Sequence, residues 1–130
     1  MSRILVIDDE RSIGELLRDY LEKAGYDVQI AVNGDEGMRL FREQPADLII
    51  TDIFMPIREG LDTIKELHRD YPGVKIIAMS GGCRVEPGNA STMDFLSIAK
   101  EFGACATFSK PFHMKDILAA VDKLLGRIQE

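Results

Sequence analysis

The sequence has few cysteines, no long apolar run and no excess of basic charge, and each absence disfavours a class of protein. Two cysteines among 130 residues do not make the disulfide framework of a secreted domain, so we expect reduced thiols and a cytoplasmic protein. The apolar runs are far shorter than the roughly 18 residues of a transmembrane helix. The net charge of −6 argues against direct binding to nucleic acid, which needs a basic patch or stripe.

The length and composition fit one globular domain. A chain of 130 residues has single-domain length, and 45% hydrophobic and 29% charged residues are ordinary proportions for such a domain. The first three residues lead directly into an apolar run, so we expect no signal peptide. The final helical pattern ends close to residue 130, so we expect a single domain over residues 1–130 with no output domain.

Strand-like and helix-like apolar patterns alternate along the chain. Strands are predicted at residues 3–8, 27–32, 47–52, 75–80 and 106–109. A helix is predicted after each strand, and the apolar face of the first comprises Ile13, Leu16, Leu17, Tyr20, Leu21 and Ala24. A long glycine-rich loop is predicted at residues 81–91. This alternation predicts an α/β fold, a flavodoxin-like (βα)5 doubly wound parallel sheet with strand order 2-1-3-4-5.

Four of the five predicted strands end in a functional group. Open parallel α/β sheets bind their ligands at the carboxyl ends of the strands, where the strand order reverses. The second strand, which the predicted order places at an outer edge, ends without an ionisable group. The groups at the other strand ends are Asp8 and Asp9, Asp52, Ser80, and Lys110.

The three carboxylates would repel one another, by about 4 kcal/mol for a pair about 4 Å apart at an effective dielectric constant of about 20. Such a cluster needs a compensating cation or lysine, and an accessible all-oxygen site suits Mg²⁺ or, in its place, Mn²⁺. A carboxylate that attacks phosphorus forms an aspartyl phosphate. The metal and Lys110 would then offset the charge on the phosphoryl oxygens.

Structural roles and two other functions compete with this interpretation. Taken singly, Asp9 could cap a helix and Lys110 could be a surface lysine. A flavodoxin-like cofactor binder would have a phosphate loop rich in glycine, serine and threonine, whereas Asp8-Asp9-Glu10 would repel a phosphate. A phosphatase with an aspartyl nucleophile would carry a second acid two residues later, and Asp52-Ile53-Phe54 lacks it.

Together, these motifs resemble the receiver domain of two-component response regulators over essentially the whole chain. The resemblance implies a signalling protein that takes a phosphoryl group from a histidine kinase or histidine phosphotransfer protein. Such a protein catalyses only its own phosphorylation and dephosphorylation, and it signals through a conformational change. The motifs are Ile4-Leu5-Val6-Ile7-Asp8-Asp9-Glu10, Thr51-Asp52-Ile53-Phe54-Met55-Pro56 with Gly60, Ser80, Gly103-Ala104 and Lys110-Pro111-Phe112.

The resemblance also implies a role for each site residue. Asp52 corresponds to the phosphoacceptor, and the peptide bond between Lys110 and Pro111 is expected to be cis. Metal ligation is implied for Asp9 directly, for Asp8 through water, for Asp52, and for the backbone carbonyl of Phe54. Contact with the phosphoryl group is implied for the Lys110 ammonium, the Ser80 hydroxyl and the amides of Ile53 and Gly81.

Two features depart from the family pattern. Thr107 stands three residues before Lys110, where the family usually carries tyrosine or phenylalanine, and Phe108 should point to the opposite face of its strand. Residues 81–91 are longer than usual, so they are a candidate region for signal output. The alternative function is a protein-interaction module with the receiver fold that works without phosphorylation.

Overall fold

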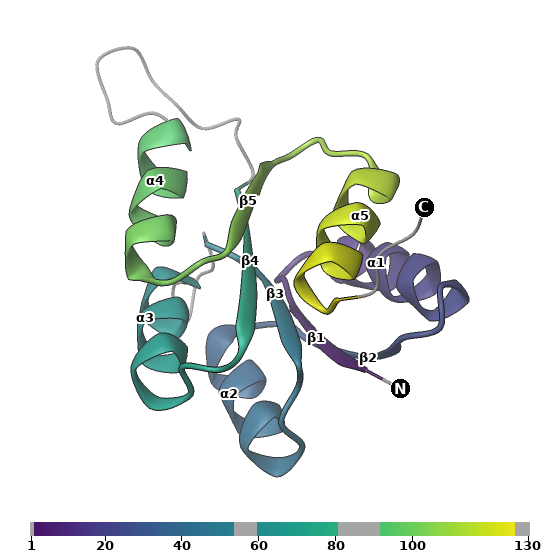
Figure 1. Ribbon diagram of the computed structural model, residues 1–130, viewed down its shortest axis with the longest axis horizontal. Coiled ribbons are helices and arrows are strands. Elements are labelled where there is room, and N and C mark those ends of the chain that lie inside the picture. The colour runs from purple at the N-terminus through teal and green to yellow at the C-terminus, as the bar shows by residue number, and fades with distance from the viewer. Residues whose placement is uncertain (1, 54–59, 81–91, 127–130) are drawn as a thin grey trace.

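The computed structural model describes residues 2–53, 60–80 and 92–126. They form a five-stranded parallel sheet with the strand order β2-β1-β3-β4-β5, which confirms the predicted fold (Figure 1). Each strand begins and ends at or within one residue of its predicted bounds. The strands are β1 (Arg3–Ile7), β2 (Asp27–Ala31), β3 (Leu48–Asp52), β4 (Lys75–Ser80) and β5 (Ala106–Ser109).

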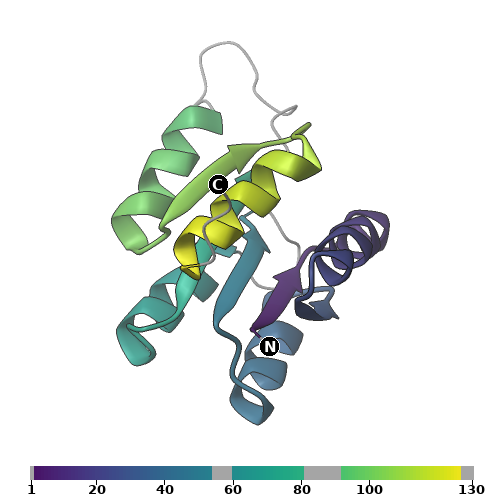
Figure 2. The ribbon, with the colours of Figure 1, turned by 45° about the vertical axis from the view of Figure 1, so that its right-hand side comes forward.

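Helices cover both faces of the sheet, with α1 and α5 on one side and the other three on the opposite side (Figure 2). None of the helices in the described ranges is long and apolar enough to cross a membrane. The helices are α1 (Arg11–Lys23), α2 (Gly34–Glu43), α3 (Gly60–Asp70), α4 (Thr92–Phe102) and α5 (Met114–Leu124).

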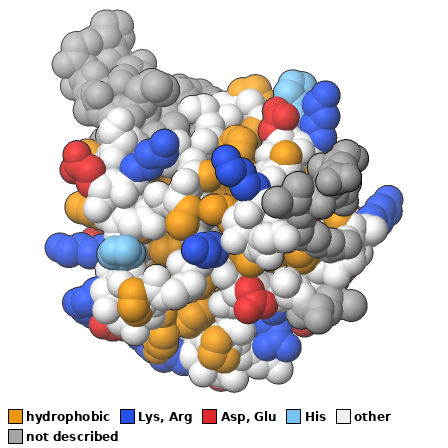
Figure 3. All heavy atoms as spheres, in the orientation of Figure 1, with side chains coloured by type: hydrophobic (Ala, Val, Ile, Leu, Met, Phe, Trp, Pro, Cys, Tyr) orange, Lys and Arg blue, Asp and Glu red, His pale blue; other side chains and the backbone are white. Residues whose placement is uncertain are grey.

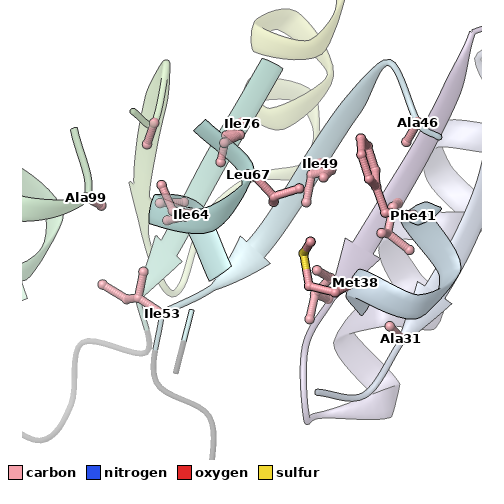
Figure 4. Close-up of a cluster of buried hydrophobic side chains, with 14 residues drawn as sticks. Ala31, Met38, Phe41, Ala46, Ile49, Ile53, Ile64, Leu67, Ile76 and Ala99 are labelled. Carbon is pink, nitrogen blue, oxygen red and sulfur yellow. The ribbon is translucent and has the colours of Figure 1, made fainter. Parts of the chain in front are cut away.

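Successive side chains of the central strands point to opposite faces, and so the buried residues divide into two clusters. Leu5, Ile7 and Ile49 pack with side chains of α2 and α3, among them Met38 and Ile64 (Figure 4). The neighbouring Ile4, Val6 and Ile50 pack with Leu17 and Leu21 of α1 and with Ile117 and Val121 of α5. Strands buried on both faces explain the nearly continuous apolar runs in the sequence.

The predicted apolar face of α1 is too wide. Leu17 and Leu21 are fully buried, but the side chains of Leu16 and Tyr20 are 55% and 37% exposed. Residues four apart share one row along a helix, and each of these pairs forms such a row. The row containing Leu17 and Leu21 packs against the sheet and α5, so the prediction of one apolar face that includes Leu16 and Tyr20 was too broad.

Polar interactions fix the ends of several elements. Gly25, which has a φ of 100°, follows α1, and the Asn33 side chain caps α2 by accepting a hydrogen bond from the Glu36 amide at 2.8 Å. On the other side of the sheet from the α2 cap, the buried Tyr26 hydroxyl donates to the Asp122 carboxylate of α5. Cys105 is a free, exposed thiol, whereas Cys83 lies outside the described residues.

Charged side chains are mixed on the surface. On the face shown in Figure 3, the Lys and Arg side chains of the described residues lie dispersed among acidic and apolar ones. Among all the described residues, some basic side chains pair with acids, such as Arg42 with Glu66 at 2.8 Å and Arg39 with Glu43 at 3.3 Å.

Candidate functional site

The strands bring the predicted acids together at the carboxyl edge of the sheet. β1 and β3 are hydrogen-bonded neighbours, with Ile7 opposite Thr51, so Asp8 and Asp52 continue from adjacent strands. Both residues are buried, at 0% and 3% exposure, whereas Asp9 is exposed. One carboxylate oxygen from each of these three residues lies within 4.8 Å of the others. The predicted acidic cluster is therefore present.

Lys110 contacts two of the three acids in this cluster. It directly follows β5, and its ammonium nitrogen Nζ is 2.8 Å from Asp8 Oδ2 and 3.2 Å from Asp52 Oδ2. A third carboxylate, that of Glu10, lies 3.4 Å from the same nitrogen. The Lys110 side chain is only 11% exposed, so these interactions are partly shielded from solvent.

The pKa values of Asp8 and Lys110 are both raised, but for different reasons. Burial raises the pKa of the Asp8 carboxyl, although hydrogen bonds from Lys110 and from the Glu10 amide oppose this effect. Burial alone would lower the pKa of Lys110, but its hydrogen bonds and charge interactions with Asp8 and Asp52 raise it above its usual value. The lysine is thus positively charged at neutral pH and offsets part of the negative charge.

The donor set fits a hard divalent cation. Three carboxylates supply oxygen ligands, which are the ligands that Mg²⁺ prefers, and the exposed Asp9 leaves the cluster open to solvent. The single positive charge of Lys110 does not neutralise three carboxylates, so a cation would lower the remaining repulsion. Phe54, whose carbonyl was predicted as a further ligand, lies outside the described residues.

Ser80 places a buried hydroxyl at the end of β4. Its side chain is fully buried, and within the described ranges its Oγ has no hydrogen-bond partner. Its carbonyl accepts a hydrogen bond of 2.7 Å from the Lys110 backbone amide, which fixes Ser80 beside the lysine. An unpartnered buried hydroxyl is unfavourable, so it is a group that a ligand oxygen would satisfy.

The predicted phosphoryl contacts of the backbone remain predictions. The Ile53 amide donates to the Met79 carbonyl at 2.9 Å, and the Ile53 side chain is buried in the core. This amide is therefore engaged in the sheet in the present structure. Gly81, predicted to supply the other amide, lies outside the described residues together with the rest of the loop at 81–91.

The backbone of Asp52 is closely packed against the start of α3. A Cβ atom at Gly60 would lie 2.0 Å from the Asp52 carbonyl oxygen, so only glycine fits there without a shift of the backbone. The Gly60 amide donates to the Ile53 carbonyl at 3.1 Å, and the Thr51 hydroxyl donates to the Asp52 carbonyl at 3.0 Å. These contacts hold the end of β3 in a fixed position.

The fifth strand agrees with the predicted departure from the family pattern. Thr107 lies opposite Ala78, which belongs to the cluster beneath α2, α3 and α4, and Phe108 packs against the cluster beneath α1 and α5. The two residues thus face opposite sides of the sheet, as predicted. The peptide bond between Lys110 and Pro111 is cis, which is also confirmed.

Sequence analysis missed the contact between Glu10 and Lys110. Glu10 was named only as part of the acidic run Asp8-Asp9-Glu10, and no contact with Lys110 was predicted for it. A signal was available, because Glu10 follows Asp9 directly at the edge where the functional groups gather.

Among known proteins, the chain is similar to transcriptional regulators. It is 30% identical over 127 residues to the transcriptional regulatory protein CpxR of Klebsiella pneumoniae and to CpxR of Escherichia coli K12. In each case the match covers 98% of this chain and 50% of the relative. The chain thus spans about half the length of these curated relatives.

Solved structures of similar length share the whole fold. The CheY-like receiver domain protein of Methanospirillum hungatei matches with a TM-score of 0.84 and 30% identity, covering 98% of this chain and 96% of that one. The response regulator TrrA of Thermotoga maritima, solved in complex with Mg(2+)-BeF, matches with a TM-score of 0.80 and 32% identity, covering 95% and 99%. The sequence model of the response regulator receiver domain matches residues 4–122. This chain therefore belongs to the response regulator receiver domain family.

Proposed function

We propose that this receiver domain, spanning residues 1–130, takes a phosphoryl group onto Asp52 from a histidine kinase or a histidine phosphotransfer protein. The observation that carries the proposal is the position of Lys110, whose ammonium lies 3.2 Å from Asp52 within a cluster of three carboxylates. The receiver family is a signalling module rather than a catalytic enzyme, and it works in two-component phosphorelays. Phosphorylation would change the conformation of the domain and so its binding to a protein partner in the cytoplasm.

The proposed reaction is an in-line transfer between two residues. A carboxylate oxygen of Asp52 attacks the phosphorus, the bond between phosphorus and the imidazole nitrogen of the donor breaks, and its electron pair stays with that nitrogen. Lys110 offsets negative charge on the phosphoryl oxygens, because its ammonium already faces Asp52. A bound Mg²⁺ or Mn²⁺ would supply further charge compensation. The metal would be held by Asp8, Asp9, Asp52 and the Phe54 carbonyl.

Ser80 is the proposed switch residue. Its buried hydroxyl has no partner within the described ranges, and phosphorylation would bring an acceptor oxygen to the same edge of the sheet. The amides of Ile53 and Gly81 are proposed as further contacts, which for Ile53 requires loss of its hydrogen bond to Met79. The complex of TrrA with Mg(2+)-BeF supports this chemistry for a related domain.

The proposal is tested by incubation with a small phosphodonor and Mg²⁺. Intact-mass measurement should detect one added phosphoryl group, labile in base, on the wild type and none on Asp52→Asn. The matched control is Asp19→Asn, which alters an exposed carboxylate of α1 and should leave phosphorylation unchanged. The same modification on Asp52→Asn would contradict the assignment. An unmodified wild type would favour the alternative, an interaction module that works without phosphorylation, with which Thr107 is compatible.

A further inference from the structure

Lys110 and a bound cation would use the same carboxylates. The ammonium contacts Asp8 Oδ2 and Asp52 Oδ2, and both residues belong to the acidic triad. Two positive charges cannot approach the same oxygens without repulsion, so a cation in the triad favours movement of the lysine. The displaced ammonium is largely buried and needs a nearby carboxylate that the cation does not use.

Glu10 meets this requirement. Its carboxylate lies 3.4 Å from Lys110 Nζ, outside the triad, and its side chain is 60% exposed. Glu10 occupies the N-cap position of α1, but its side chain makes no capping hydrogen bond. Its backbone amide donates to Asp8 Oδ1 at 2.8 Å, which fixes the position of Glu10 beside the buried acid. The Glu10 side chain therefore contacts Lys110 and does not cap the helix.

We propose that Glu10 is a positioning residue that receives the Lys110 ammonium when a divalent cation binds to the acidic triad. Without Glu10, the ammonium would stay with Asp8 and Asp52 and would compete with the cation more strongly. Glu10 thus raises the affinity for the cation without contacting it. This inference rests on the proposed function, because it needs a cation at the triad.

The direct test is a Mg²⁺ titration followed by thermal stability, which requires no phosphorylation. Glu10→Gln should raise the Mg²⁺ concentration at the midpoint roughly two- to fivefold, the scale expected for loss of one partly exposed ion pair. The control is Glu22→Gln, which removes the same charge from an exposed position near the other end of α1. Its midpoint should stay close to that of the wild type.

The second test repeats the Glu10 substitution in a Lys110→Met background. If Glu10 acts by holding the ammonium, removal of that ammonium should reduce the effect of Glu10→Gln to the level of the Glu22 control. An equal shift in both backgrounds would mean that Glu10 acts only through its charge and would overturn the proposal. An unchanged midpoint in Glu10→Gln would overturn it as well.

The outcomes separate this inference from the proposed function. A wild-type protein that binds Mg²⁺ and is phosphorylated on Asp52, together with an unaffected Glu10→Gln variant, would overturn the role of Glu10 alone. A wild-type protein whose melting is unchanged by Mg²⁺ would overturn both. Glu10 is an exposed side chain, so its conversion to the isosteric glutamine should leave the fold intact.

Discussion

The interior of the sheet and its carboxyl edge are built from the same strands but from opposite kinds of residue. In β1, Ile4 to Ile7 are buried and apolar, and the next residue is the buried Asp8. In β3, Leu48, Ile49 and Ile50 precede the buried Thr51 and Asp52. In each strand, the buried apolar segment that stabilises the fold is therefore followed, within one or two residues, by a buried carboxylate.

The two regions make opposite contributions to stability. Burial of apolar side chains in the interior stabilises the folded state, by about 1.5–3 kcal/mol for a large aliphatic side chain. At the edge, a carboxylate and an ammonium are removed from water, and their attraction must first offset the loss of hydration. The interior therefore supplies the stability of the fold, whereas the charged edge contributes little to it. The following predictions test that division.

The largest effect is expected in the interior. Ile50→Ala removes a fully buried side chain between α1, α5 and the sheet, so the free energy of unfolding should fall by about 2–5 kcal/mol. Urea unfolding measures this loss, and the control Leu16→Ala, at a 55% exposed position, should lose far less. The folded Ile50→Ala protein should still be phosphorylated. A loss of phosphorylation without a loss of stability would show that Ile50 serves the site rather than the stability of the interior.

At the carboxyl edge of the sheet, a substitution is expected to raise the free energy of unfolding. Asp8→Asn removes one of three neighbouring negative charges but also one partner of Lys110. The unfolding free energy without Mg²⁺ should therefore rise by only the order of 1 kcal/mol, a fraction of the roughly 4 kcal/mol repulsion of one charge pair about 4 Å apart at an effective dielectric constant near 20. The variant should also lose most of the stabilisation by Mg²⁺, which for a single site is about 2.7 kcal/mol at a hundredfold excess over Kd. Reduced stability without Mg²⁺ would contradict this prediction.

The pH dependence of the same variant follows from the raised pKa of Asp8. A carboxyl whose pKa is raised by folding binds its proton more tightly in the folded state, so the stability it contributes is present at acidic pH and is lost as the pH rises through the folded pKa. The advantage of Asp8→Asn should be small below about pH 4, near the ordinary pKa of aspartate, and should grow toward neutral pH. Urea titrations at several pH values measure it.

The smallest change in stability is expected at Ser80. Ser80→Ala removes a buried hydroxyl that has no partner within the described ranges, so the unfolding free energy should stay the same or rise by at most about 1 kcal/mol. Phosphorylation should nevertheless become slower, because the proposed contact to a phosphoryl oxygen is lost. A destabilised variant would indicate that Ser80 has a structural hydrogen bond after all.

The strand pattern was predictable from the sequence, whereas the exposure of α1 was not. Buried parallel strands need continuous apolar runs, and runs such as Ile4 to Ile7 identify them directly. A helix needs only one covered row, and which row is covered depends on where α5 packs. The sequence of α1 does not contain that information, so Leu16 and Tyr20 were predicted to share one apolar face with Leu17 and Leu21.

The site was predictable as a set of strand ends but not as a set of contacts. The strand order alone places Asp8 beside Asp52, because β1 and β3 are neighbours. The distance between Lys110 and Glu10 depends on the path of two side chains from different elements, and no spacing in the sequence specifies it. The engagement of the Ile53 amide in the sheet depends on the register between β3 and β4.

The ion pair between Lys110 and Asp8 joins residues 102 positions apart. During synthesis, the first strand and its acids leave the ribosome long before the lysine that compensates their charge. A chain interrupted before β5 would retain Asp52 and the rest of the acidic cluster but would lack this ammonium. The acidic edge therefore gains the charge compensation of Lys110 only once the last strand has docked beside β4.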